Sequence, residues 1–210
     1  MRHYLYILIC ASSLLFACSK QDVTAPRIML NPDTTGIHYR GHPFVEPGVH
    51  AFDDQTCSLD DILEISGYVD TSLYGSYYIN YQVEDAAGNP AVAIRQVDIV
   101  LPVEDLYSIF WDAHDTCTTG TYFYTGKTQD CDCDAFAVTV SNISDFGASA
   151  TFTLPVSGQY NQEIVLDTAK SGVYFNGLGT MSRNADTIYW DYTIQDTIDT
   201  DVCRSVWVKD

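Results

Sequence analysis

The chain has 210 residues, of which 46% are hydrophobic and 18% are charged. This balance predicts folded domains and excludes a disordered chain. Acidic residues number 28 against 10 basic ones, for a formal net charge of -18. Such a surface repels phosphate backbones, so we expect no nucleic-acid partner.

The first 17 residues have the pattern of a secretory leader. Arg2 and His3 give a short basic start, and residues 4–16 form an apolar run without charge. That run is shorter than the ~20 apolar residues that span a bilayer, but it has the length of a signal-peptide core. Residues 1–17 are therefore predicted to be a signal peptide.

The end of this run is its most specific feature. Leu15-Phe16-Ala17-Cys18 resembles the lipobox of bacterial lipoproteins. The resemblance implies that Cys18 becomes a lipidated N-terminus, and two or more acyl chains hold a protein firmly to a membrane. Residues 18–25 would be a tether, and we predict a surface-exposed outer-membrane protein. The alternative is an ordinary signal peptide cut near Ala17, with Cys18 incidental.

Residues 26–101 show the pattern of a first β-domain. Short apolar runs are separated by turn residues, and Tyr77, Ile79, Tyr81 and Val83 alternate with polar neighbours. Strict alternation predicts strands with one buried face, and several short strands of this kind indicate a β-sandwich.

The same segment carries a set of motifs in a specific order. They are Glu46-Pro47-Gly48, Val69-Asp70-Thr71-Ser72, Gly75-Ser76-Tyr77 with Tyr81, Asp85-Ala86-Ala87-Gly88-Asn89, and Arg95. This series resembles the bacterial immunoglobulin-like domain of pesticidal crystal proteins and surface adhesins. The resemblance implies a non-catalytic spacer or binding module with no catalytic residues to transfer.

An acidic loop interrupts this domain. Asp53, Asp54, Asp60 and Asp61 lie close together in the sequence. Calcium takes ~6–8 oxygen ligands, so these carboxylates are a possible calcium site, although the spacing is not that of an EF-hand. The alternative is a solvated acidic loop. No cofactor is predicted.

Residues 102–116 are predicted to be a connector, and residues 117–210 a second all-β domain. Strand-like runs follow one another with short turns between them: 120–124, 136–143, 149–156, 159–166, 173–181, 187–194 and 202–208. They predict an antiparallel meander that forms a small barrel or sandwich. Residues 174–179, 188–194 and the strand near Cys203 weakly resemble lipocalin-like domains, which implies a cavity for a small apolar ligand. The alternative is a filled interior.

Cysteines beyond the anchor are Cys57, Cys117, Cys131, Cys133 and Cys203. Export favours disulfides. We predict a Cys117–Cys203 bridge, on the reasoning that the first and last strands of a seven-strand meander run the same way and bring both cysteines to one end. Cys131 and Cys133 are predicted to be too close for an easy mutual bridge, so that one pairs with Cys57 or stays free.

A metal site is the alternative use of these cysteines. His114-x-x-Cys117 and Cys131-x-Cys133 offer four zinc ligands, but one intervening residue is short of the usual two to four. We therefore predict no metal.

The sequence offers no motif for catalysis. It has neither Gly-x-Ser-x-Gly nor His-Glu-x-x-His, and we expect no enzyme. Tyr78, Tyr122 and Tyr189, predicted on outward strand faces, are candidates for stacking on sugars, although sheet tyrosines often only pack across strands. The predicted function is a lipid-anchored binding or adhesion module for a glycan or protein. The alternatives are a hydrolase with its site in the C-terminal domain and a structural subunit of an outer-membrane complex.

Overall fold

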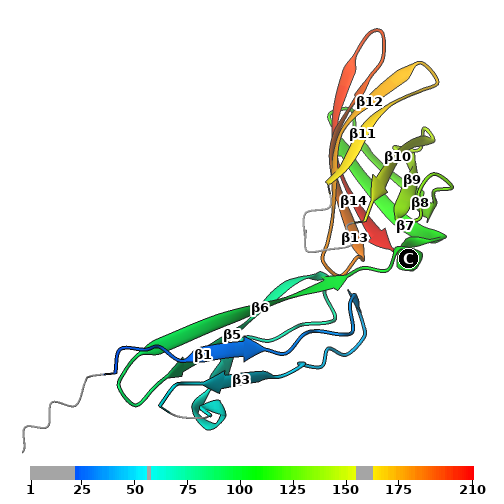
Figure 1. The fold of residues 1–210 in the computed structure, drawn as a ribbon. Helices are drawn as coiled ribbons and strands as arrows, with labels where there is room; N and C mark the ends of the chain where they lie inside the picture. Colours follow the sequence, from blue (N-terminus) through cyan, green and yellow to red (C-terminus); the bar gives the residue numbers. More distant parts are fainter. Residues whose placement is uncertain (1–21, 56–57, 155–162) are drawn as a thin grey trace, which may run out of the picture. The chain divides into compact units, whose positions relative to one another are not determined.

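The structure is a computed structural model that describes residues 22–55, 58–154 and 163–210. The described residues form β-strands in three sheets and two short 3-10 helices (Figure 1). The predicted all-β class is confirmed. The predicted leader and Cys18 lie outside the described residues. No helix in the described ranges has the length and apolar character needed to cross a membrane.

The first domain contains six strands in two sheets. β1 pairs antiparallel with β3, and a second sheet has the order β2-β6-β5-β4. The strands are β1 (Arg27–Leu30), β2 (His38–Tyr39), β3 (Val49–Phe52), β4 (Glu64–Ser66), β5 (Gly75–Glu84) and β6 (Pro90–Val100), with the helix η1 (Asp60–Ile62) between β3 and β4.

The predicted alternation of β5 is confirmed. Ile79, Tyr81 and Val83 are buried, whereas their neighbours Asn80 and Gln82 are exposed. Val83 packs in a small core with Ala51 of β3 and Leu59, so the sheet of β1 and β3 covers β5 at this position. This is the two-layer arrangement that period-2 strands form when each sheet buries one face.

The described chain divides into two compact units. One contains residues 22–30, 49–55, 58–64 and 81–93, and the other contains residues 31–48, 65–80 and the described part of 94–210. The second unit holds the eight-stranded sheet described next.

The eight-stranded sheet is an up-and-down antiparallel meander. Its order is β10-β9-β8-β7-β14-β13-β12-β11, and the end strands β10 and β11 lie near each other, so the sheet is a nearly closed barrel (Figure 1). The strands are β7 (Ile109–Cys117), β8 (Thr121–Asp130), β9 (Ala137–Ile143), β10 (Ala148–Thr153), β11 (Glu163–Lys170), β12 (Val173–Met181), β13 (Thr187–Gln195) and β14 (Thr200–Lys209).

The prediction of a connector over residues 102–116 was wrong from Ile109 onward. The helix η2 (Val103–Leu106) occupies its start, and β7 occupies the rest. β7 does alternate, with Trp111, Ala113 and Asp115 buried. The pattern was missed because one of these inward residues is small and another is a carboxylate, so few apolar side chains mark the buried face.

The additional strand changes the closure of the meander. The sheet has eight strands, so the first and last in chain order, β7 and β14, run antiparallel. The prediction assumed seven strands, of which the first and last would run the same way, and that reasoning was wrong. β14 pairs directly with β7, and Cys203 is the register partner of Cys117. The first and last strands of the sheet in chain order are therefore joined by hydrogen bonds in its middle, and its open seam lies between β10 and β11.

Large aromatic side chains fill the middle of the barrel. Trp111, Trp190 and Trp207 are fully buried. A Cβ at Gly126 of β8 would lie 2.1 Å from the Trp207 ring, and one at Gly179 of β12 would lie 2.6 Å from the Trp190 ring. Glycine at these positions therefore makes the room that the indole rings occupy, and the centre of the barrel is packed with side chains.

Candidate functional site

The topology brings four turns to one end of the barrel. In an up-and-down meander, alternate turns lie at the same end. The turns after β7, β9, β11 and β13 therefore gather where Cys117 and Cys203 are joined, with an S–S distance of 2.03 Å. We call this the disulfide end.

A cavity of about 620 Å³ lies at the disulfide end. Small-molecule sites commonly occupy about 300–1,000 Å³. The walls combine aromatic, hydroxyl and carboxylate side chains, drawn from the β7–β8 and β9–β10 turns and the ends of β8, β13 and β14. They are Thr119, Thr121, Tyr122, Phe123, Tyr124, Ser144, Asp145, Phe146, Ile194 and Asp201.

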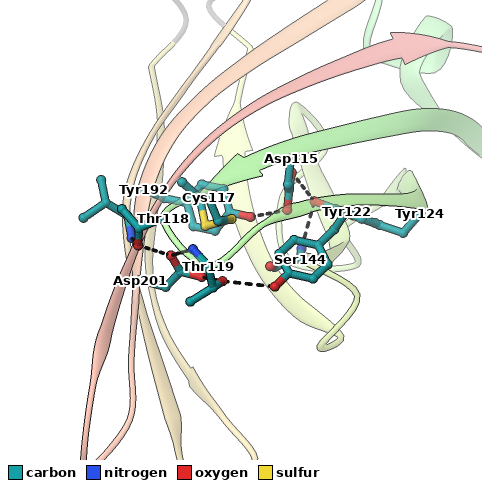
Figure 2. The surroundings of a disulfide bond; sticks show 11 residues. Asp115, Cys117, Thr118, Thr119, Tyr122, Tyr124, Ser144, Tyr192 and Asp201 are labelled. Carbon is teal, nitrogen blue, oxygen red and sulfur yellow. Dashed lines mark hydrogen bonds between the residues drawn. A yellow bond between two sulfur atoms is a disulfide. The ribbon is translucent and has the colours of Figure 1, made fainter.

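Asp201 orders one side of the cavity (Figure 2). It accepts hydrogen bonds from the Thr118 and Thr119 hydroxyls and from the Thr119 N–H, the last at 3.2 Å. Burial tends to raise the pKa of Asp201, but these hydrogen bonds outweigh it and hold the pKa below its usual value. The carboxylate is therefore charged at neutral pH and fixes the β7–β8 turn.

The same hydrogen bonds orient Tyr122. The Thr119 hydroxyl has one proton, which it donates to Asp201, and its oxygen lies 3.0 Å from the Tyr122 hydroxyl. The Tyr122 O–H is therefore the donor to Thr119. This leaves the Tyr122 oxygen as an acceptor at the cavity.

A second chain of hydrogen bonds lies deeper (Figure 2). Asp115 is fully buried, and its two oxygens accept hydrogen bonds from the hydroxyls of Tyr124, at 3.1 Å, and Tyr192. The Ser144 N–H donates to the Tyr124 hydroxyl at 2.9 Å. Burial, together with the neighbouring Asp115, raises the pKa of Tyr124 and of Tyr192 far above the usual range. Both phenols therefore stay protonated and remain donors to the buried carboxylate.

The β9–β10 turn forms another wall in an uncommon backbone conformation. Asn142, Ser144 and Asp145 have φ values of 65°, 56° and 56°. Asn and Asp tolerate this left-handed region better than Ser does, and such residues tend to cluster at functional sites. Asn142 Nδ2 ties the turn to β8 through the Thr125 carbonyl at 2.9 Å.

The predicted site cysteines are in disulfides. Cys117 is bonded to Cys203, and Cys131 is bonded to Cys133 with a Cα–Cα distance of 5.1 Å. The prediction that the last two are too close to bridge was wrong, because the turn after β8 brings their sulfur atoms together across one residue. Cys57 lies outside the described residues.

These bridges also bear on the zinc alternative. The sulfur atoms of Cys117, Cys131 and Cys133 are oxidised, whereas zinc binds thiolates. His114 points away from the barrel interior and stacks on Phe123, with ring centroids 4.5 Å apart.

The three candidate tyrosines lie in different places. The prediction that Tyr122 faces outward was wrong, because it lines the cavity. Tyr189 of β13 is 51% exposed and Tyr78 of β5 is 54% exposed, and neither lines this cavity. The inward position of Tyr122 follows from register, because its partner on β7 is the buried Asp115.

The acidic loop is divided in the structure. Asp60 accepts hydrogen bonds from the Ala51 N–H at 2.6 Å and contacts His50 Nδ1 at 3.0 Å. Asp53 and Asp54 instead lie near Asp22, with one oxygen of each within 4.8 Å of the others. The predicted group of four carboxylates is therefore not brought together.

Sequence reasoning missed Asp115, Phe146 and Asp201 as site residues. Asp115 was assigned to a connector. Phe146 lies in the β9–β10 turn and Asp201 near the start of β14, and their meeting depends on the closure of the barrel. One signal could have identified Asp115. Its neighbours on a strand of period 2 face outward, so its carboxylate has to face the barrel interior.

The motif residues of the first domain serve its structure. Arg95 pairs with Glu46 at 3.0 Å and donates to the Gly48 carbonyl at 3.0 Å. Asp85 accepts hydrogen bonds from the N–H groups of Ala87 and Asn89, both at 2.8 Å. These contacts fix the turns that connect the strands.

Comparisons with known proteins found two similar structures and one family model. No curated protein matches the chain. A crystal structure of a lipoprotein from Bacteroides thetaiotaomicron is similar at 16% identity, covering 86% of this chain and 98% of that chain, with a TM-score of 0.33. A carbohydrate-binding module in complex with GlcNAc, with INT domains, from Clostridium perfringens ZmpB is similar at 12% identity, covering 88% and 44%, with a TM-score of 0.28. Residues 28–99 match the family model for the bacterial surface protein Ig-like domain, so this segment is an Ig-like domain of the kind found in bacterial surface proteins.

Proposed function

We propose that the chain is a lipid-anchored protein of the bacterial cell surface, and that it acts as a non-catalytic binding module with its ligand site at the disulfide end. The observation that carries the proposal is the surface-protein Ig-like domain at residues 28–99. It begins a few residues after the lipobox Leu15-Phe16-Ala17-Cys18. The short segment between them serves as the tether.

The barrel supports the binding part of the proposal. Its centre is packed with indole rings, whereas the disulfide end has a cavity with aromatic and polar walls. A packed scaffold that presents a site at its turns is a common arrangement for recognition.

The non-catalytic part is supported by the state of the carboxylates. Asp145 and Asp201 are the carboxylates that line the cavity. Both oxygens of Asp201 accept hydrogen bonds from threonines, and Asp115 is fully buried, which leaves Asp145 without a second carboxylate to work with. A glycoside hydrolase uses a pair of carboxyl groups that flank the bond it breaks. The competing hypothesis of a hydrolase predicts new reducing ends when the protein is incubated with oligosaccharides, and their release would overturn the non-catalytic proposal.

Anchoring is tested by comparing the full chain with Cys18→Ala and with Cys10→Ala in a Gram-negative host. Cys10 lies in the leader and is the matched control. We expect palmitate labelling and outer-membrane fractionation for the wild type and Cys10→Ala, and loss of both for Cys18→Ala. Protease added to intact cells should degrade the wild-type protein. Equal labelling of Cys18→Ala would reject the anchor, and protection from protease would reject the surface position.

A further inference from the structure

We infer that the cavity at the disulfide end binds a neutral saccharide, with a pyranose ring stacked on Tyr122 or Phe146 and its hydroxyls bonded to Thr121, Ser144 and Asp145. The inference rests on the proposed binding function and names the class of its ligand.

Two of the aromatic rings that line the cavity are about half exposed. Tyr122 is 46% exposed and Phe146 is 49% exposed, and they reach the cavity from β8 and from the β9–β10 turn. A pyranose has an apolar C–H face and a polar edge. Half-exposed aromatic rings surrounded by hydroxyl groups match both parts of such a ring.

Both rings are held in place before a ligand arrives. The Tyr122 hydroxyl is bonded to Thr119, which Asp201 fixes in turn. Phe146 packs against the buried Phe175, with ring centroids 5.7 Å apart. Preformed walls reduce the conformational entropy that binding removes, so weak sugar contacts yield more net affinity.

The charges at the cavity select against anions. Asp145 and Asp201 line it, and none of the described lining residues is Lys, Arg or His. Lys170 approaches the turn at Gly147 but is not among the lining residues. A carboxylated or sulfated sugar would therefore meet repulsion that no lining cation offsets.

The polar groups favour hydroxyls over an ammonium ligand. The charge of Asp201 is already stabilised by Thr118 and Thr119, and Asp145 accepts one hydrogen bond from Asn142 at 3.2 Å. Most other polar groups at the cavity are neutral hydroxyls. Those of Thr119, Tyr122 and Tyr124 already donate their proton within the protein, whereas the hydroxyl of Thr121 can both donate and accept. A sugar hydroxyl can match both kinds of group, whereas an ammonium group can only donate.

The test uses the chain from Ser19 to Asp210 and calorimetric titration with defined trisaccharides. The neutral probes are the trisaccharides of mannose, glucose, xylose and N-acetylglucosamine, and the anionic probe is trigalacturonate. The variants are Tyr122→Ala, Phe146→Ala and Tyr122→Phe. Tyr189→Ala is the matched control, because Tyr189 is a half-exposed barrel tyrosine outside the cavity. Thermal unfolding of each variant checks its fold.

We expect at least one neutral trisaccharide to bind. Tyr122→Ala or Phe146→Ala should weaken it about tenfold or more. Tyr122→Phe should weaken it less than Tyr122→Ala, and Tyr189→Ala should leave it unchanged. Binding of trigalacturonate alone, or of no probe, would overturn the inference.

The outcomes separate this inference from the proposed function. Neutral sugar binding that survives both alanine substitutions overturns the cavity as the site but leaves a surface binding module. Absence of sugar binding in a protein that is lipidated and surface-exposed overturns the ligand class alone.

Discussion

Trp207 occupies the space that a side chain at Gly126 would need. The two residues belong to β14 and β8, on either side of β7, and a Cβ at position 126 would lie 2.1 Å from the Trp207 ring. Gly126→Ala should therefore destabilise the barrel by about 1–3 kcal/mol, through overpacking. Urea unfolding followed by tryptophan fluorescence measures the change.

Thr125→Ala on the same strand is the control for Gly126→Ala, because Thr125 is exposed and should show a change below about 0.5 kcal/mol. Equal stability of Gly126→Ala and the wild type would show that Trp207 does not fill this space.

Tyr192→Phe should destabilise the folded chain by about 1–3 kcal/mol at neutral pH. The substitution removes one of the two hydroxyls that donate to the buried Asp115, and a buried carboxylate that loses a donor carries its desolvation cost. Denaturant unfolding measures the loss. Tyr189→Phe, at an exposed tyrosine, should have little effect, and similar losses for both would contradict the role of Asp115.

Alkaline pH should destabilise the protein through the same tyrosines. Burial raises the pKa of Tyr124 and of Tyr192 above the usual value of 10.0. The unfolded chain then releases these protons first, so the free energy of unfolding falls as pH rises above 10. The decrease reaches about 1.4 kcal/mol per pH unit for each phenol. Unfolding at pH 9, 10 and 11 measures the slope, which should be smaller in Tyr192→Phe. An unchanged slope would show that Tyr192 ionises normally in the folded protein.

The Cys117→Ala/Cys203→Ala double variant should lose up to about 4–5 kcal/mol of stability. The bridge joins residues 86 positions apart, and the chain-entropy model gives about this value for a loop of that length. Denaturant unfolding of the double variant and of the wild type, both without reductant, measures the loss. Cys131→Ala/Cys133→Ala removes a bridge between residues two positions apart and should cost much less. A larger loss from the second variant would contradict this explanation.

Asp201→Asn should loosen the β7–β8 turn. The pKa of Asp201 lies below its usual 3.8, so its stabilising effect is present above that pH and is lost as pH falls through the lower folded value. The wild type should therefore lose stability in acid faster than Asp201→Asn does. Urea unfolding at pH 7, 4 and 3 compares them, and parallel curves would contradict the role of Asp201.

Local patterns predicted the strands better than their arrangement. The alternation of Tyr77, Ile79, Tyr81 and Val83 is visible in sequence, because each apolar residue alone marks the buried face. β7 was missed because Ala113 and Asp115 carry little or no apolar signal, although both are buried.

The cavity was beyond reach of the sequence for a different reason. Tyr122 was identified as exposed, but its neighbours at the cavity are Phe146 in the β9–β10 turn and Asp201 near the start of β14, both further along the chain. Alternate turns of a meander share an end whatever the number of strands, but the curvature that gathers them around one cavity leaves no mark in the sequence. Missing β7 gave the wrong relation between the first and last strands.

The pairing of β7 with β14 has a consequence for synthesis at the ribosome. Each of the other ladders in this sheet joins strands that are consecutive in the chain. Such a pair can form its hydrogen bonds soon after its second strand has been made. One edge of β7 stays unpaired until β14 has been translated and exported, and Cys203 of β14 lies 86 positions after Cys117 of β7. A chaperone that covers this unpaired edge would therefore matter most for β7, which is the first strand of the sheet to be made and the last to complete its pairing.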